Sequence, residues 1–230
     1  MSDAQVLASV DIVALRLDEQ GELQLVLIRR AREPFMGQWA LPGVLVNGRC
    51  ADSSLDHAAG RALDEKARVR PAYLEQVATV GSATRDPRGW SLATIYLALL
   101  NPATQLLGED LSFMPLAEVL AGRQSLPFDH AQLVAKACER LASKAVYTSL
   151  PLHLLAPSFT VSQALVAFQA CLGQPVQHTT LRGRLERMKQ QGWVVDTGHK
   201  NQPKMGRPQN LLEHRPGVGE VFVFDRSVLV

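Results

Sequence analysis

The first 147 residues alternate short apolar runs with polar turns. Apolar runs rich in β-branched residues predict four strands, at 10–17, 23–30, 77–82 and 92–100. Apolar residues repeated at helical spacing predict three helices, at 53–68, 116–120 and 129–144. Because strands and helices interleave along the chain, we expect residues 1–147 to form one α/β sandwich.

The pattern changes after residue 147. Residues 148–158 carry Pro151 and Pro157 around a short apolar stretch and are interpreted as a linker. The remaining elements are predicted as helices at 161–172 and 179–191, and strands at 193–197 and 209–213 around a polar, basic loop. Helix, turn, helix, strand, long loop and strand is the order of a winged helix-turn-helix domain, which we expect over residues 159–230.

Composition excludes several classes of protein. Of the 230 residues, 47% are hydrophobic, but no unbroken apolar run approaches the ~20 residues that span a bilayer. The three cysteines are widely spaced and form no C-x-x-C pair, so we expect neither a disulfide framework nor a metal site. A cytoplasmic protein without a membrane partner is the simplest interpretation.

Charge differs between the two parts. Residues 1–150 hold 15 basic and 17 acidic side chains, whereas residues 151–230 hold 9 basic and 5 acidic ones. A short basic domain beside a slightly acidic one suggests a polyanion partner for the carboxyl-terminal part. Charge alone would equally suit a solvated basic face.

One helix resembles a known catalytic motif from which acids are missing. After Trp39-Ala40-Leu41-Pro42-Gly43, the stretch Arg61-Ala62-Leu63-Asp64-Glu65-Lys66-Ala67-Arg68-Val69 looks like the end of a Nudix box. Nudix enzymes hold divalent cations between glutamates of this helix to split a pyrophosphate. Here Ala62 and Lys66 stand where two of those acids belong, and an ammonium repels Mg²⁺. We therefore expect a degenerate domain with no catalytic residues, not an enzyme.

A second motif resembles the loop of Nudix proteins that handle ADP-ribose. Thr84-Arg85-Asp86-Pro87-Arg88-Gly89-Trp90 contains two arginines whose planar forks suit a pyrophosphate. Asp86 would accept a hydrogen bond from a ribose hydroxyl or cap the loop, and Trp39 and Trp90 would stack on a base or pack in the core. The resemblance implies a ligand site made of Arg30, Trp39, Arg85, Asp86, Arg88, Trp90 and His130.

The second predicted helix of the winged domain is rich in basic residues. Leu181, Leu185 and Met188 would form its buried stripe. The side chains left for DNA are Thr179, Thr180, Arg182, Arg184, Arg187 and Lys189 on the helix, with Lys200, Lys204 and Arg207 on the wing. The segment from Phe159 to about Leu212 is similar to the carboxyl-terminal domain of the NrtR family, Nudix-related transcriptional repressors of NAD metabolism.

These resemblances together imply a sensor. The expected fold is a Nudix α/β/α sandwich followed by a winged helix-turn-helix domain. The protein would bind a double-stranded DNA operator as a homodimer, repress genes of NAD biosynthesis or salvage, and release DNA when ADP-ribose or a related nucleotide effector binds; no other cofactor is expected. An active ADP-ribose pyrophosphatase with an accessory domain is the alternative. A protein-interaction adaptor is a third class, which would show no salt-dependent DNA binding.

Overall fold

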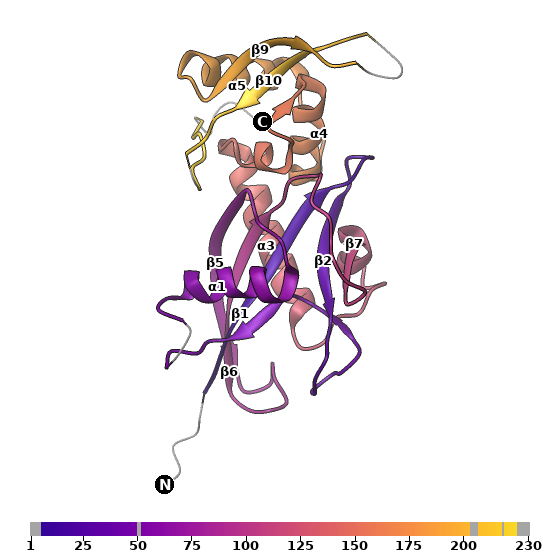
Figure 1. The fold of residues 1–230 in the computed structure, drawn as a ribbon, viewed down its shortest axis with the longest axis vertical. Helices are drawn as coiled ribbons and strands as arrows, with labels where there is room; N and C mark the ends of the chain where they lie inside the picture. The colour runs from indigo at the N-terminus through magenta and orange to yellow at the C-terminus, as the bar shows by residue number, and fades with distance from the viewer. Residues whose placement is uncertain (1–5, 50–51, 203–206, 218, 225–230) are drawn as a thin grey trace.

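The chain folds into two parts stacked along one long axis (Figure 1). The computed structural model describes residues 6–49, 52–202, 207–217 and 219–224. The amino-terminal part holds a seven-stranded sheet, and the carboxyl-terminal part holds a three-stranded sheet with its helices. The long helix α3 (His130–Tyr147) runs through the first part and ends beside the second.

The large sheet is mixed, as the interleaved pattern predicted. Its strands are β1 (Leu7–Leu17), β2 (Leu23–Arg29), β3 (Trp39–Ala40), β4 (Gly43–Leu45), β5 (Tyr73–Ser82), β6 (Ser91–Leu99) and β7 (Leu111–Pro115). They are ordered β3-β2-β1-β6-β5, with β4 on β1 and β7 on β2. β1 pairs in parallel with β6 and lies in the middle of this order, which explains why its side chains from Val10 to Leu15 are all buried. The four predicted strands are confirmed; β3, β4 and β7 were not predicted.

Helices cover both faces of this sheet and make the expected α/β/α sandwich. On one face, α1 (Leu55–Ala62) continues as the π-helix η1 (Leu63–Ala67) over a core that includes Ala58, Ala62 and Tyr96. Ser54 is the N-cap of α1: its Oγ accepts from the backbone N–H of His57 at 3.1 Å. On the other face lie α2 (Leu116–Leu120) and α3, over the larger core.

The segment interpreted as a linker is buried. It contains the 3-10 helix η2 (Leu150–Leu154), whose leucine side chains are at most 2% exposed. Leu150 and Leu154 belong to the core beneath the large sheet, whereas Leu152 belongs to the core of the carboxyl-terminal part. The two cores are therefore joined by packed side chains at this point.

The carboxyl-terminal part has the predicted winged-helix order. Its elements are β8 (Ser158–Phe159), α4 (Val161–Leu172), α5 (His178–Gln190), β9 (Val194–Lys200) and β10 (Asn210–His214), and its sheet is ordered β8-β10-β9. Thr160 and Gln163 form a reciprocal capping box at the start of α4, and Gly173 ends that helix at a φ of 65°. The helices α3 and η2 both pack against α4.

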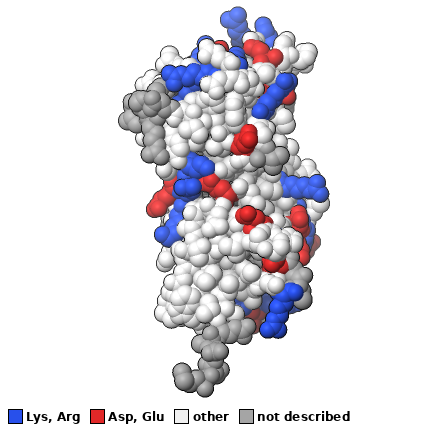
Figure 2. Space-filling view, turned by 90° about the vertical axis from the view of Figure 1, so that its left-hand side faces the viewer, with Lys and Arg blue, Asp and Glu red and all other residues white. Residues whose placement is uncertain are grey.

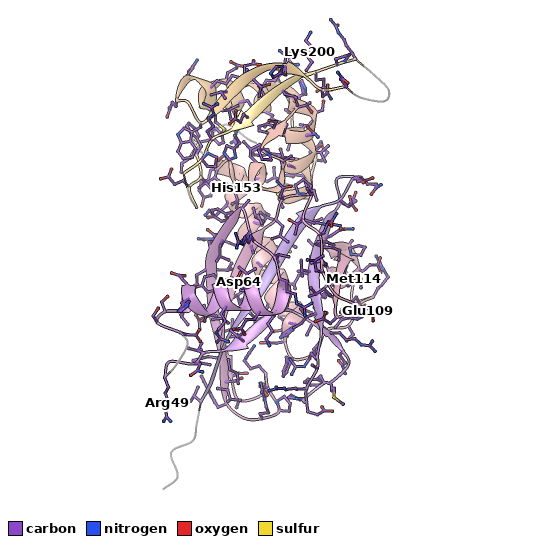
Figure 3. The ribbon with its side chains drawn as sticks, in the orientation of Figure 1. Arg49, Asp64, Glu109, Met114, His153 and Lys200 are labelled. Carbon is purple, nitrogen blue, oxygen red and sulfur yellow. The ribbon has the colours of Figure 1, made fainter. Side chains whose placement is uncertain are left out.

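Basic side chains project from the winged-helix end of the molecule (Figure 2). Lys200 lies near the end of the wing, far from Asp64 on the sheet domain, and His153 lies between the two parts (Figure 3). No helix in the described part of the chain combines the length and apolar character needed to cross a bilayer.

Candidate functional site

Arg85 ties the loop after β5 to the start of α3. Its Nε and Nη2 donate to the two carboxylate oxygens of Asp129 at 3.0 and 2.9 Å, and its Nη1 donates to the Ser91 hydroxyl at 3.2 Å. The Arg85 side chain is 7% exposed and that of Asp129 16%. Because Asp129 is the residue that precedes the first turn of α3, this bidentate pair fixes the loop relative to the helix.

Two buried titratable groups lie beside this pair. Asp11 of β1 has an oxygen 4.0 Å from Arg85 Nη2 and another 3.9 Å from His130 Nε2. Burial raises the pKa of Asp11 to about 6 and lowers the pKa of His130 to about 3. His130 is therefore neutral at pH 7, and its Nδ1 accepts the backbone N–H of Leu41 at 3.1 Å.

His130 was among the predicted ligand residues, but its side chain is buried and joins α3 to the loop after β3. Asp11, by contrast, was not predicted. An acid between Val10 and Ile12 in an apolar strand was the signal that could have identified it.

Asp86 caps the loop that contains it. Its carboxylate accepts from the backbone N–H of Arg88 at 2.9 Å and from Arg88 Nη2 at 2.7 Å. The Asp86 side chain is 5% exposed, whereas that of Arg88 is 41% exposed. Of the two roles expected for Asp86, the structure contains the loop-capping one. Arg88 keeps one edge of its guanidinium toward solvent.

The remaining predicted ligand residues lie around this loop in different settings. Arg30 Nε donates to the carbonyl of Pro34 at 2.8 Å, and its guanidinium carbon lies 4.8 Å from the centre of the Phe128 ring. Trp39 packs against the large core, so packing is the role observed for it. Trp90 is 47% exposed, which leaves its ring accessible.

A hollow of about 590 Å³ opens beside the Arg85–Asp129 pair. The residues that line it include Phe35, Gln38, Thr84, Arg85, Phe128 and Asp129. The rings of Phe35 and Phe128 meet edge to face, with centroids 4.8 Å apart. The hollow thus combines aromatic surface with a guanidinium, the two features that suit a base and a phosphate. Of the predicted ligand residues, Arg85 is the one that lines it.

In the helix that resembles the Nudix box, the carboxylates have separate partners and do not converge on one point. Arg61 donates to both carboxylate oxygens of Asp52, at 2.9 and 2.7 Å, and Asp56 accepts from the hydroxyl of Tyr96 at 2.6 Å. Glu65 is 54% exposed and its nearest cationic contact is Arg61 at 3.8 Å. Among the described residues, no three His, Cys, Asp or Glu side chains lie together as a metal site would require.

The second candidate surface is formed by α5 and the wing. Thr179, Arg182 and Arg187 are exposed on α5, and Thr180 is half-buried at its start. Lys189 donates to Glu186 at 3.2 Å and to Asp196 at 3.4 Å, so its charge is shared with two carboxylates. On the wing, Lys200 and Arg207 are exposed, while Lys204 lies outside the described residues.

Arg184 does not belong to this surface, and its prediction as a DNA contact is corrected. The residue is 1% exposed. Its Nη2 donates to the carbonyl of Val146 in α3 at 2.6 Å, and its guanidinium carbon lies 4.4 Å from the centre of the Phe224 ring. The spacing i, i+3, i+4 and i+7 places Arg184 within the stripe formed by Leu181, Leu185 and Met188, which is why it points inward.

No family model matches the chain. The chain is 38% identical over 195 residues to the "ADPR responsive transcriptional repressor NtrR" of Acinetobacter baylyi, covering 83% of this chain and 75% of that protein.

Two solved structures resemble the chain, one over nearly its whole length and one over the amino-terminal part. NrtR of Shewanella oneidensis complexed with a 27mer DNA superposes with a TM-score of 0.80 at 36% identity, over 92% of this chain and 95% of that one. The Nudix domain of the same protein complexed with ADP ribose is 40% identical, with a TM-score of 0.53 over 60% of this chain and 90% of that one. The mixed sheet with its covering helices is therefore a Nudix fold, followed by the carboxyl-terminal domain of a full-length regulator.

Proposed function

This chain belongs to the NrtR family of transcriptional repressors, and we propose that it represses genes of NAD biosynthesis or salvage in response to ADP-ribose or a related metabolite. The winged helix would bind operator DNA and the Nudix part would hold the effector. One observation carries the proposal: a hollow lined by Arg85 and a basic helical surface lie on one molecule, joined by α3.

The winged-helix end supplies the DNA contacts. Arg182 and Arg187 on α5, with Lys200 and Arg207 on the wing, are exposed and can reach phosphates or base edges. Thr179 and Thr180 begin α5, where backbone N–H groups also face a phosphate. Lys189 contributes less, because Glu186 and Asp196 already neutralise it.

The effector would lie in the hollow beside Arg85. The guanidinium offers the pyrophosphate the bidentate geometry that it now gives to Asp129, and Phe35 or Phe128 offers a ring to the adenine. Arg30 contacts Phe128, which lines the hollow, and would add positive charge there. Arg88 and Trp90 belong to the same loop as Arg85 and have exposed side chains, and we propose that they extend the site.

We infer that this domain binds its nucleotide without hydrolysing it. The homologous proteins with which it shares most of its length are regulators. Glu65 and Asp64 are acids of the box helix, but Ala62 and Lys66 replace two others, and Arg61 is engaged by Asp52. A divalent cation needs several carboxylates at one point to activate water, which these residues do not provide.

The assembly is proposed to be a homodimer in the cytoplasm. Two copies of α5 related by a twofold axis would meet half-sites about one helical turn apart on a palindromic operator. The working boundaries remain residues 1–147 for the sensor, 148–158 for the connection and 159–230 for the DNA-binding domain.

A binding assay with two ligands tests this function. Duplexes from the chain's own upstream region and neighbouring promoters would be titrated with protein, at several salt concentrations, without and with ADP-ribose or NAD. We expect tight binding that weakens steeply with salt and changes when ADP-ribose is added. Failure to bind any such duplex at low salt would refute the repressor.

The alternative, an active ADP-ribose pyrophosphatase, is tested by Mg²⁺-dependent hydrolysis. We expect no turnover above background. Robust turnover that the variant Glu65→Gln abolishes would instead establish the hydrolase.

A further inference from the structure

The last described residues fold back onto the joint between the two parts. We name residues 219–224 the C-terminal strap. The backbone N–H of Phe224 donates to the carbonyl of Tyr147 at 2.6 Å, and Ser149 exchanges two hydrogen bonds with the backbone of Phe222, both 2.9 Å. Val223 also forms a β-bridge with Thr148. The strap is thereby paired with the segment that ends α3.

Arg184 connects this strap to α5. Its guanidinium lies over the Phe224 ring and donates one hydrogen bond to Val146, in the last turn of α3. Among the described residues, its Nε and Nη1 are buried without a partner. A buried guanidinium that is only partly paired is costly, and an apolar side chain would fill the same space more favourably. Stability alone therefore does not account for an arginine at this position.

The two ends of α3 thus contact the two sites. At its start, Asp129 holds Arg85 of the proposed effector hollow. At its end, Val146 accepts from Arg184 of the helix proposed to read DNA. The 18 residues of α3 make a helix about 27 Å long. No other described helix has both contacts.

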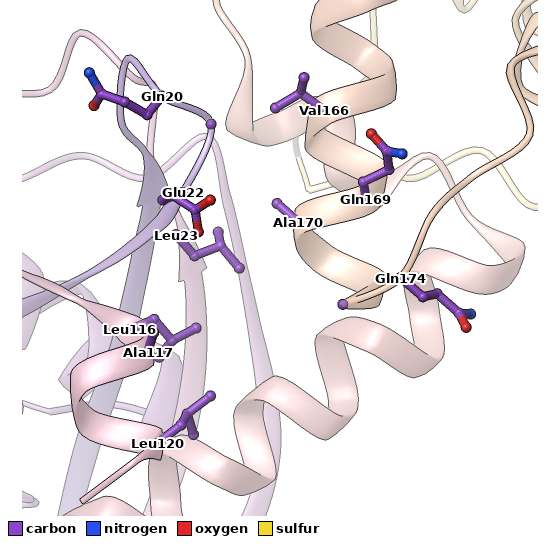
Figure 4. Close-up of a pocket in the computed structure, with 12 residues that line it drawn as sticks. Gln20, Glu22, Leu23, Leu116, Ala117, Leu120, Val166, Gln169, Ala170 and Gln174 are labelled. Atoms are coloured by element: carbon purple, nitrogen blue, oxygen red, sulfur yellow. The ribbon is translucent and has the colours of Figure 1, made fainter. Parts of the chain in front are cut away.

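The opposite side of the joint is hollow. A groove of about 460 Å³ separates α4 from the turn between β1 and β2 and from α2, and a second hollow of about 570 Å³ adjoins it. Figure 4 shows Val166, Gln169 and Ala170 of α4 facing Leu23 and Leu120 across the groove. This side of the joint is therefore less completely filled than the side that the strap covers, while Ala167 and Cys171 of α4 still pack in the core beneath the large sheet.

We propose that Arg184 and the C-terminal strap are the joint through which α3 couples effector binding to the placement of α5. This rests on the proposed function. A phosphate that takes the donors of Arg85 competes with Asp129, which releases the start of α3. Because Arg184 and the strap fasten α5 to the other end, a shift of α3 moves the DNA-reading helix. Arg184 is a positioning residue in this scheme, and it touches neither ligand.

The test is a thermodynamic cycle with ADP-ribose and a promoter duplex that the wild-type chain binds. The coupling factor is the ratio of the duplex Kd with saturating ADP-ribose to the Kd without it. Factors of about 5 to 150 are usual for coupled sites. In R184M we expect a factor below about 2, while the Kd for ADP-ribose alone stays within about twofold of wild type. The matched control is R123M, which removes an exposed arginine that pairs with Glu118 rather than with α3, α5 or the strap, and should keep the wild-type factor.

A wild-type coupling factor in folded R184M would overturn the proposal. If R184M fails to fold, the coupling factor is measured in F224L, with the same expected and contradicting results. This variant keeps an apolar strap but removes the ring beneath Arg184.

A second readout separates this proposal from the repressor function. Amide hydrogen exchange with and without ADP-ribose, on the full chain without DNA, should change at residues 147–149 and 222–224. If no duplex binds but exchange at these amides changes, the proposed repressor function is refuted and the proposed coupling through the joint is supported. If ADP-ribose binds without altering exchange there, the proposed coupling is refuted.

Discussion

The guanidinium of Arg85 and the carboxylate of Asp129 face each other through two parallel hydrogen bonds of 3.0 and 2.9 Å. This is the geometry that a phosphate would also adopt with Arg85. Asp129 therefore occupies the donors that an anionic ligand would need. An effector must compete with this internal carboxylate, and the competition can be measured.

Replacing Asp129 with Asn should expose that competition. The variant D129N removes the bidentate partner of a buried cation and leaves Arg85 beside Asp11 at 4.0 Å. Breaking a buried pair costs stability, so its Tm should fall. ADP-ribose should then raise the Tm of D129N by more than it raises the wild-type Tm, because its phosphates restore the lost negative charge. The control is E118Q, an exposed partner of Arg123, which should change neither value. An equal ADP-ribose shift in D129N and wild type would contradict the competition.

The variant R85A should lose the effector. Removing a charge-assisted bidentate contact costs about 1.5–3 kcal/mol, which corresponds to an affinity loss of about tenfold or more. Calorimetry with ADP-ribose measures this directly. The same variant should bind the promoter duplex and respond weakly to ADP-ribose. Full release by ADP-ribose would place the effector site elsewhere.

On α5, an exposed arginine that has no carboxylate partner among the described residues should contribute more to duplex affinity than a lysine that is already paired with carboxylates. R182A should weaken duplex binding by about 1–3 kcal/mol if Arg182 reads a base, and should reduce the salt slope by about one if it contacts a phosphate. K189A should have the smaller effect, because Lys189 already contacts Glu186 and Asp196. Anisotropy titrations at several salt concentrations distinguish these outcomes. Wild-type affinity in R182A would show that α5 is wrongly oriented in our proposal.

Asp11 should make stability fall as pH rises. Its pKa is raised from 3.8 to about 6 by burial, so the native state binds a proton that the unfolded chain has lost. The stabilising contribution of this proton is present below pH 4 and disappears as pH rises through 6. Between pH 5 and 7.5, the free energy of unfolding of the wild type should therefore fall by about 1 kcal/mol relative to that of D11N.

Urea unfolding of both chains at the two pH values provides the measurement. His130 acts in the opposite direction, because its lowered pKa costs stability as pH falls below 6.5. Its effect is common to both chains and cancels in the comparison. A difference between wild type and D11N that does not vary with pH would refute the raised pKa.

Local pattern was sufficient to predict most of the elements. Strands such as β1 and β6 carry long apolar runs, and Thr160 and Gly173 mark the ends of α4 by ordinary capping chemistry. The strand β7 was missed because its five residues, Leu111–Pro115, are short and end at a proline. Its place is fixed by pairing with β2, a contact distant in sequence.

The buried face of a helix was harder to predict where two other helices pack against different sides of it. In α4, Leu165 and Leu172 lie at helical spacing with Phe168, yet the fully buried positions are Ala164, Ala167 and Phe168, with Cys171 nearly so. The reason is that α3 covers one side of α4 while α5 covers another. The spacing of apolar residues predicts one buried face, so it cannot show how a helix divides its buried surface between two packing partners. The inward turn of Arg184 has the same origin, since its acceptor belongs to α3.

The candidate effector site was predicted in part. The loop arginines could be identified because residues 84–90 resemble a known ligand loop, but their partners could not. Asp129 and Asp11 come from elements 44 and 74 residues away from Arg85 in sequence. Only the folded sheet brings them together, so no local motif could indicate that Arg85 is already paired.

The burial of Leu150, Leu152 and Leu154 bears on how this protein can be cut or recombined. A fragment that starts at residue 159 would lose α3 and leave Ala167 and Cys171 facing water. The carboxyl-terminal part therefore cannot be transferred to another protein by itself. A chimera that joins its DNA specificity to another sensor would also have to include the last turns of α3.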